Sequence, residues 1–257
     1  MSSRSMPDPG EPDGPQFAGA GRPPAPTVSV WQATRTFFPL FVEHLLQAGA
    51  RSVCVVGASD GKFVLPLARH GLTVRAIERD PLALNGGPIT LPGPVAGSMN
   101  GLRQRLIIEG LSERVEVIQA DLLDLGDLDL SPVDAVWTSC SWHYSVNHRR
   151  PLADFVAAMQ ALCRTDRGLF GAEYIQPVHP HHLTIEHYPE TGELRRYFAG
   201  WDVVWETYTP PFVEEPHVEQ LEPHVHRMGL LIADRRNDQN LWMVPGEVTQ
   251  TSAPSRG

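Results

Sequence analysis

A strand, a glycine-containing turn, a helix and a second strand ending in an acid constrain the fold of this chain more than any other feature. The first apolar strand, residues 52–56, runs directly into Gly57-Ala58-Ser59-Asp60-Gly61. The second strand ends at Glu78, about 20 residues after the turn, which is the length that one strand–helix–strand unit needs. In such units, turn amides approach a ligand at a helix N-terminus and the acid accepts hydrogen bonds from ribose hydroxyls. The pattern therefore predicts an α/β fold that binds a nucleotide-type cofactor.

The turn differs from two better-known motifs. Ser59 and Lys62 stand where a dinucleotide fingerprint, G-x-G-x-x-G, has its second and third glycines. The G-x-S-x-G spacing also matches the nucleophile elbow of hydrolases, with Ser59 as the nucleophile. A hydrolase would leave the acid after the second strand without a role. An adenosine-containing cofactor is therefore the favoured ligand.

Two further predicted strands carry a family resemblance. Residues 114–122 end in Gln-Ala-Asp-Leu, and residues 133–138 are followed by Ser139-Cys140-Ser141-Trp142. This succession resembles the class I S-adenosylmethionine-dependent methyltransferases, most closely the tellurite-resistance type, over residues 50–235. The resemblance implies a Rossmann-like α/β fold with a mostly parallel sheet. It also implies a C-terminal antiparallel hairpin, formed by residues 192–206 and 224–233.

The same resemblance implies S-adenosyl-L-methionine as the cofactor and assigns residues to its parts. Gly57 and Gly61 would hold the methionine portion, Glu78 the ribose, and Asp121 the adenine amino group. The remaining expected cofactor contacts are Ser59 in the turn, Gln119 and Leu122 beside the adenine, and Ser139 and Trp142 facing the sulfonium.

One position departs from the family and leaves the reaction open. The family usually has an acid two residues before the first glycine, where it helps to hold the cofactor's ammonium group; here that residue is Val55. A methyltransferase acting on a small polar molecule is the first hypothesis. The alternative is a cyclase or lyase that closes the methionine chain into a small-ring amino acid and releases methylthioadenosine. That reaction needs a neutral amine, which a nearby carboxylate would disfavour. A cofactor-binding scaffold without activity is a third hypothesis, and Glu78 and Asp121 argue against it.

The catalytic candidates follow the fourth and fifth predicted strands. His143 is a candidate base near neutral pH, although it could equally be solvated or cap a helix. Tyr174 could orient the acceptor or offer its ring to the sulfonium.

Other histidines predict no metal site. Nine of the 11 histidines lie between residues 143 and 226. One group is His179, His181, His182 and His187, with Glu186 beside them. This group lacks the helical i, i+4 spacing of zinc enzymes, and Pro180 prevents one regular element from presenting it. A second group, His217, His224 and His226, is expected at a hairpin surface or in sheet packing.

Composition sets the domain organisation and the partners. The chain has 257 residues and 42% apolar residues, which suits one α/β domain, expected at residues 30–245. Residues 1–29, rich in Pro and Gly, are expected to form a disordered arm, and residues 246–257 a flexible tail.

The net charge of −9 and the scattered arginines argue against nucleic acid as a partner, and no apolar run predicts a membrane span. The three cysteines form no recognisable metal or redox pair, which favours a reducing compartment. The N-terminus shows no charged-then-apolar signal pattern, so a cytoplasmic location is expected. The oligomeric state stays open.

Two segments keep two interpretations each. Residues 30–48 are apolar on one face, so they either pack on the sheet or form a lid with Trp31 and Phe37 or Phe38 over the cofactor. Residues 84–95 are rich in Pro and Gly, and they form either a surface elaboration or a mobile site loop.

Overall fold

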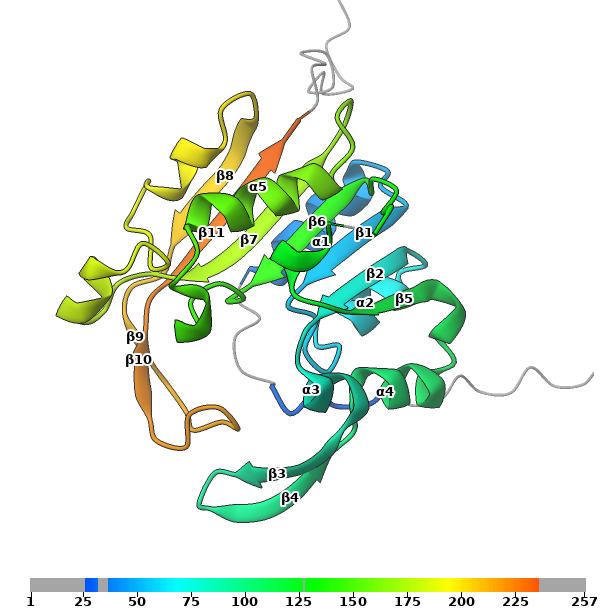
Figure 1. Ribbon diagram of the computed structural model, residues 1–257, viewed down its shortest axis with the longest axis vertical. Helices are drawn as coiled ribbons and strands as arrows, with labels where there is room; N and C mark the ends of the chain where they lie inside the picture. Colours follow the sequence, from blue (N-terminus) through cyan, green and yellow to red (C-terminus); the bar gives the residue numbers. More distant parts are fainter. Residues whose placement is uncertain (1–25, 32–36, 127, 236–257) are drawn as a thin grey trace, which may run out of the picture.

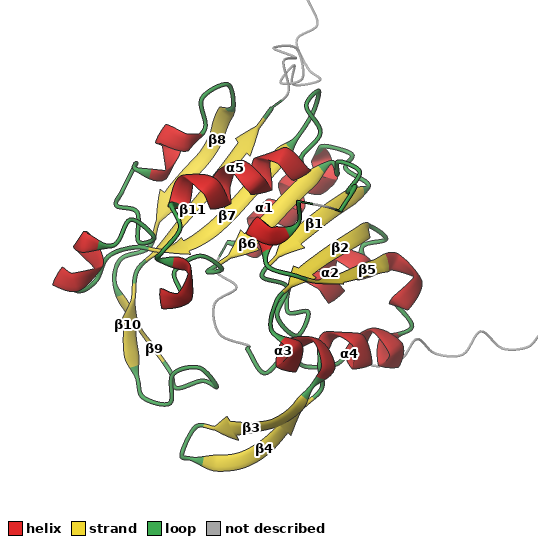
Figure 2. Cartoon of the chain, viewed as in Figure 1, coloured by secondary structure: helices red, strands yellow, loops and turns green. Residues whose placement is uncertain are grey.

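The central element is a seven-stranded sheet, seen in a computed structural model that describes residues 26–31, 37–126 and 128–235 (Figures 1 and 2). Its strands are β1 (Ser52–Val56), β2 (Thr73–Glu78), β5 (Val115–Gln119), β6 (Ala135–Ser139), β7 (Leu169–Ile175), β8 (Asp202–Tyr208) and β11 (Met228–Asp234). Their order across the sheet is β5-β2-β1-β6-β7-β11-β8. The first five are parallel to one another, and β11 runs antiparallel to both β7 and β8. The predicted fold class, including the antiparallel C-terminal pair, is confirmed.

Helices cover both faces of this sheet. They are α1 (Phe38–Gln47), α2 (Val64–Arg69), α3 (Pro81–Asn85), α4 (Leu102–Glu109) and α5 (Leu152–Leu162). Short 3-10 turns span Ser112–Arg114, Leu122–Asp124, Ser145–Asn147, Pro180–Thr184 and Leu194–Tyr197. Because side chains alternate along a strand, β1 directs Val53 and Val55 to the layer of α1, α2 and α4, and Cys54 and Val56 to the layer of α5. A strand buried on both faces is what a parallel sheet requires, and it explains the unbroken apolar run of β1.

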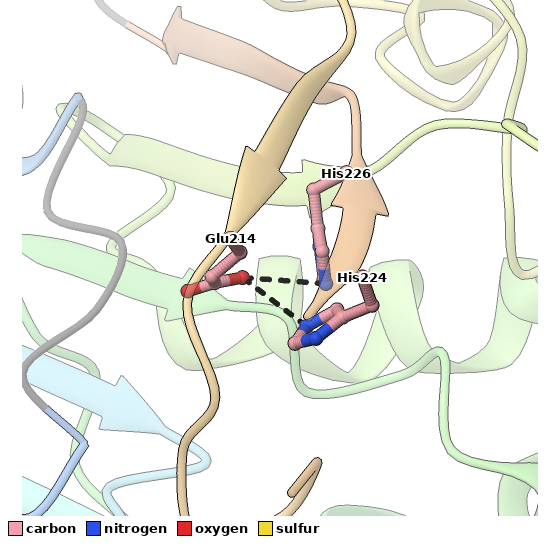
Figure 3. Close-up of side chains that lie close together, drawn as sticks. All are labelled: Glu214, His224 and His226. Carbon is pink, nitrogen blue, oxygen red and sulfur yellow. Dashed lines mark ion pairs between the residues drawn. The ribbon is translucent and has the colours of Figure 1, made fainter. Parts of the chain in front are cut away.

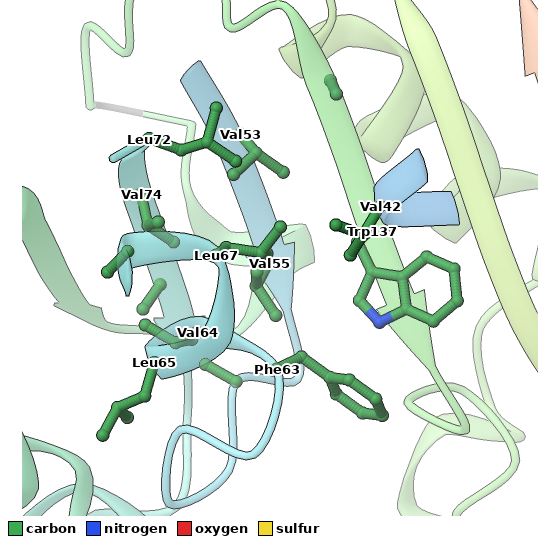
Figure 4. Packing of buried hydrophobic residues seen from close by; sticks show 14 of the residues in the cluster. Val42, Val53, Val55, Phe63, Val64, Leu65, Leu67, Leu72, Val74 and Trp137 are labelled. Carbon is green, nitrogen blue, oxygen red and sulfur yellow. The ribbon is translucent and has the colours of Figure 1, made fainter. Parts of the chain in front are cut away.

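The N-terminal helix packs on the sheet. Phe41 and Leu45 of α1 are fully buried, and the Phe41 ring lies 4.7 Å from that of Trp137 on β6. Figure 4 shows Trp137 in this layer close to Phe63, and the centroids of the two rings are 5.7 Å apart. Phe38 also packs against Trp137, so the packing interpretation holds for α1.

The folded part of the chain begins before residue 30. The Ser29 hydroxyl donates to the buried Asp60 carboxylate at 2.7 Å, and the Arg105 guanidinium donates to the Thr27 carbonyl at 3.2 Å. Residues 26–29 are therefore packed, and the predicted arm of residues 1–29 extends too far. Residues 1–25 and the predicted tail, 246–257, lie outside the described residues.

Two additional hairpins project from the sheet (Figure 1). One pairs β3 (Gly87–Leu91) with β4 (Val95–Met99), so residues 84–95 contain a surface elaboration. The other pairs β9 (Phe212–Glu214) with β10 (His224–His226).

The second hairpin corrects one prediction. Residues 224–233 were expected to form one strand, but the strand pairing changes at Arg227, whose carbonyl accepts from the Gln176 amide at 2.7 Å. None of the helices in the described ranges combines the length and the apolar character needed to cross a bilayer.

Candidate functional site

A pocket of about 920 Å³ opens beyond the C-terminal ends of the parallel strands. Its floor includes Val56 at the end of β1, Glu78 at the end of β2, Ala120 after β5 and Ser139 at the end of β6. In the sheet, β2 and β5 lie on one side of β1, and β6 and β7 lie on the other side. The strand order therefore reverses direction between β1 and β6. Ligands of open α/β sheets bind at this topological switch point.

The turn after β1 is locked to the end of β2. The amides of Gly57 and Ala58 both donate to the Ile77 carbonyl, at 3.0 and 3.1 Å. Gly57 has a φ of +71°, and a Cβ there would lie 2.8 Å from the Ser141 Cβ. Left-handed backbone and a close neighbour both explain the glycine.

Glu78 connects the turn to the second strand. One carboxylate oxygen accepts from the Ser59 amide at 2.8 Å, and the other accepts from the Asp80 amide at 2.8 Å. Ser59 itself has a φ of +52°, a left-handed conformation for a residue with a Cβ. These bonds place the Glu78 carboxylate at the rim of the pocket, where it faces the same space as the turn.

Asp121 lies on the neighbouring part of the rim. Its carboxylate accepts from the Leu123 amide at 3.0 Å and from Arg79 at 3.4 Å. Arg79 also donates to the side-chain oxygen of Asn147 at 3.0 Å. The guanidinium thus joins the segment after β5 to the loop after β6, and Leu122 adds an apolar surface to the pocket.

The loop after β6 supplies the opposite wall. The Ser139 hydroxyl donates to the carboxylate of Glu173, which is fully buried on β7, at 3.1 Å. Burial of His143 lowers its pKa to about 4, so the imidazole is neutral at neutral pH. His143 lines the pocket, where a neutral imidazole can accept a hydrogen bond, and its catalytic role stays a prediction.

Most of the predicted site residues meet in this pocket. Those that line it are Gly57, Ser59, Glu78, Asp121, Leu122, Ser139 and His143. Four others do not line it: Gly61, Gln119, Trp142 and Tyr174.

The four exceptions have separate reasons. Gly61 shapes the turn with a φ of +92°, and Gln119 is exposed at the end of β5. Trp142 and Tyr174 are instead part of the core on the α5 side, with ring centroids 6.1 Å apart. Tyr174 lies opposite Gly229 of β11, where a Cβ would be 2.5 Å from the tyrosine ring, so the missing side chain makes room for the ring.

The β9–β10 hairpin contributes pocket residues that the sequence did not predict. Glu214, His224 and His226 line the pocket together with His217 and Glu219 from the connecting segment. The Tyr144 hydroxyl donates to the Glu219 carboxylate at 3.0 Å, which joins the hairpin to the loop after β6. The only sequence signal was the spacing of His224 and His226, which places both on one side of a strand.

Trp31 also lines the pocket. Its neighbour Val30 donates its amide to Asp60 at 3.0 Å, and this bond holds the segment beside the turn. The residue thus occupies the position that the lid interpretation gave it, whereas Phe37 and Phe38 pack with the core.

Comparison with solved structures identifies the fold. TehB from Haemophilus influenzae superposes with a TM-score of 0.55 at 12% identity, covering 79% of this chain and 64% of TehB, less than two thirds of its length. A second similar structure comes from work on the conversion of a disulfide bond into a thioacetal group during echinomycin biosynthesis. It superposes with a TM-score of 0.52 at 20% identity, and the match covers 78% of this chain and 82% of that chain. The 1,6-didemethyltoxoflavin-N1-methyltransferase of Burkholderia thailandensis superposes with a TM-score of 0.50 at 16% identity. The match covers 81% of this chain and 82% of that enzyme. The fold is that of class I methyltransferases, as the sequence resemblance implied. No protein-family model matches the sequence, and comparison with curated proteins gives no match.

Proposed function

We propose that this protein is an S-adenosylmethionine-dependent methyltransferase acting on a small polar molecule that binds in the same pocket as the cofactor. The observation that carries the proposal is the convergence of the Gly57–Ser59 turn, Glu78 and Asp121 on one side of the pocket. The Burkholderia thailandensis enzyme, which has the same fold, contains bound S-adenosylhomocysteine.

Each rim residue has a chemical role in this proposal. The Glu78 carboxylate would accept hydrogen bonds from the ribose hydroxyls, and Asp121 would accept from the adenine amino group. Leu122 would contact the adenine face. The turn would bring its backbone close to the methionine portion, since Gly57 has no side chain to prevent the approach.

The chemistry then needs alignment more than it needs a strong base. A bound S-adenosylmethionine would supply the methyl group. The acceptor's lone pair would form the bond to the methyl carbon, the carbon–sulfur bond would break toward sulfur, and the acceptor's proton would pass to solvent. The sulfonium already activates the methyl group, so holding the two molecules in line supplies most of the rate. Neutral His143 would accept a hydrogen bond from the acceptor and orient it.

Binding of S-adenosylhomocysteine, measured by isothermal titration calorimetry, tests the cofactor site. Glu78→Gln keeps the side-chain shape and removes the charge, and it is expected to weaken binding by about 10-fold or more because hydrogen bonds to charged groups contribute about 1.5–3 kcal/mol. Glu116→Gln is the matched control, because Glu116 pairs with Arg75 on the sheet and lies outside the pocket. A wild-type protein that does not bind S-adenosylhomocysteine would contradict the proposal.

The cyclase or lyase remains the second candidate because of Val55. This residue is fully buried in the core, so its position offers the cofactor's amine no carboxylate. The nearest acid of the turn, Asp60, is paired with Arg105 at 3.0 Å and with Ser29. However, the pocket is at the upper end of the range of about 300–1,000 Å³ for small-molecule sites, which favours room for a second molecule.

Mass spectrometry of the protein incubated with S-adenosylmethionine alone separates the two reactions. Methylthioadenosine that accumulates without an acceptor would establish the cyclase or lyase. Intact S-adenosylmethionine would favour the methyltransferase, and small polar acceptors would then be tested.

A further inference from the structure

Three metal-binding side chains meet on one face of the β9–β10 hairpin. Glu214 lies directly across from His224 in the antiparallel register, and His226 follows two residues later on the same strand. All three side chains therefore share one face of the two-stranded ribbon, and they point toward one another (Figure 3). The side chains are only 7%, 12% and 16% exposed, in the order Glu214, His224 and His226.

Their spacing suits an ion between them. The Glu214 Oε2 atom lies 3.5 Å from His224 Nε2 and 3.3 Å from His226 Nε2. Charge-assisted hydrogen bonds are shorter, about 2.7–2.9 Å. Ligands at about 2.0–2.1 Å from a tetrahedral zinc ion lie about 3.3–3.4 Å from one another. The donor atoms of all three residues lie within 4.8 Å of one another, so a small adjustment completes the set.

The hydrogen bond at the far side of one ring orients it for coordination. The Nδ1 atom of His224 lies 3.0 Å from the Glu222 carbonyl. A carbonyl only accepts, so Nδ1 carries the proton and Nε2 of the neutral ring keeps its lone pair. Metal-binding histidines usually donate their other ring N–H to a carbonyl or carboxylate in this way.

We propose that Glu214, His224 and His226 bind a divalent transition-metal ion of the zinc type at the wall of the pocket that the β9–β10 hairpin forms. Two imidazoles and one carboxylate select zinc-like ions over magnesium and calcium, which prefer all-oxygen ligands. Three protein ligands also leave a coordination position open, as in catalytic rather than structural zinc sites. All three residues line the pocket, so the open position is accessible to a bound molecule.

This ion's use rests on the proposed function. An acceptor hydroxyl or thiol that coordinates the ion would release its proton to solvent, because a bound cation lowers the pKa of such a ligand. The acceptor's lone pair would then form the bond to the methyl carbon, and the carbon–sulfur bond would break toward sulfur. The substrate class is therefore a small molecule with a metal-binding oxygen or sulfur at the methylated position.

Zinc titration of the full-length, chelator-treated protein by isothermal calorimetry tests the site, with Co²⁺ absorption as a second readout. The wild-type protein is expected to bind one Zn²⁺ per chain. His226→Ala and Glu214→Gln are expected to weaken binding by about 100-fold or more, since loss of a second-shell partner already costs about 10–100-fold. The Co²⁺ complex should show the intense visible bands of a tetrahedral site in the wild-type protein and lose them in both variants.

Two controls distinguish this site from other histidines. His179 and His181 are exposed and stacked on each other outside the pocket, so the double variant His179→Ala, His181→Ala should bind zinc like the wild type. The Nδ1 atom of His217 accepts from the Glu219 amide, so the Nε2 atom of His217 carries the proton. This Nε2 atom lies 3.3 Å from His224 Nε2. A metal ion on His224 displaces the contact with His217, so His217→Ala should not weaken zinc binding.

Absence of zinc binding by the wild type, or binding that His226→Ala retains, would overturn the metal site. Each variant is also tested for S-adenosylhomocysteine binding, which reports folding and the cofactor site independently of the metal. A protein that binds zinc but no S-adenosylhomocysteine would retain the metal site and reject the proposed function. The opposite pattern would reject the metal site alone.

Discussion

Replacement of Asp60 by alanine is expected to lower the free energy of unfolding by about 3 kcal/mol. The Asp60 carboxylate and the Arg105 guanidinium are only 1% and 2% exposed, and they pair at 3.0 Å. Removing one member of a buried ion pair costs about 3–5 kcal/mol, because the other charge stays buried. Arg105 would keep its bonds to the Asp60 backbone carbonyl and to Thr27, which places the expected loss at the lower end.

The same carboxylate also holds the segment that carries Trp31, through Ser29 and Val30. Asp60→Ala should therefore weaken S-adenosylhomocysteine binding in addition to its effect on stability. Asp60→Asn keeps the shape of the side chain and should have a smaller effect on stability, because the amide oxygen can still accept a hydrogen bond.

Urea unfolding followed by tryptophan fluorescence measures the loss. Asp124→Ala is the control, because Asp124 pairs with Arg150 where the two side chains are 63% and 42% exposed. A surface pair of this kind contributes about 0–1 kcal/mol. An equal loss of unfolding free energy in Asp60→Ala and Asp124→Ala would mean that the buried pair stabilises the fold no more than the exposed pair does.

Gly57→Ala is expected to lower both thermal stability and S-adenosylhomocysteine affinity, because its φ is +71° and the new Cβ would lie 2.8 Å from the Ser141 Cβ; unchanged melting and binding would contradict the turn geometry. Trp137→Ala should cost about 3–5 kcal/mol in urea unfolding, because the residue is fully buried; a loss below about 1 kcal/mol would mean that the layer repacks. Burial acts to raise the pKa of Glu109, but hydrogen bonds, above all from Thr27, outweigh it and lower the pKa. The stability that Glu109 contributes is thus present at neutral pH and is lost as the pH falls through the depressed pKa. The wild type should lose more unfolding free energy on acidification than Glu109→Gln, and equal losses would argue against this contribution.

The first two strands and the turn between them could be predicted well because their signals are local. The predicted strand at residues 52–56 matches β1, and the second strand ends at Glu78 as expected. An apolar run followed by a glycine-containing loop can be recognised from a few consecutive residues. The apolar run indicates a buried strand, and the glycines indicate a turn with positive φ. The role of Asp121 was implied by the family resemblance. The residue lies in the same pocket as Glu78 because the carboxyl ends of adjacent parallel strands meet at one edge.

The start of the helix after the turn is a property of the folded chain. α2 begins at Val64, three residues after Gly61. The Gly57 and Ala58 amides bond to the end of β2, the Gly61 amide donates to the Ala58 carbonyl within the turn, and Phe63 is the N-cap of the helix.

Whether an aromatic residue faces the pocket or the core could not be read from the chain. Tyr174 belongs to β7, a strand buried along its whole length, so alternation does not identify the side that meets the ligand. Its ring fits only because Gly229 occupies the opposite position on β11, and that pairing joins residues far apart in the sequence.

The sequence by itself determined the sheet, the cofactor-type turn and the two acids of its rim, because each depends on a few consecutive residues and on strands that end at one edge. The tertiary structure alone decided the wall of the pocket that the β9–β10 hairpin forms. Glu214 and His224 become partners through the β9–β10 register, and His226 joins them because the strand pairing changes at Arg227. Such pairing is a property of the folded chain, since the free energy that selects a register comes from contacts between segments and not from either segment alone.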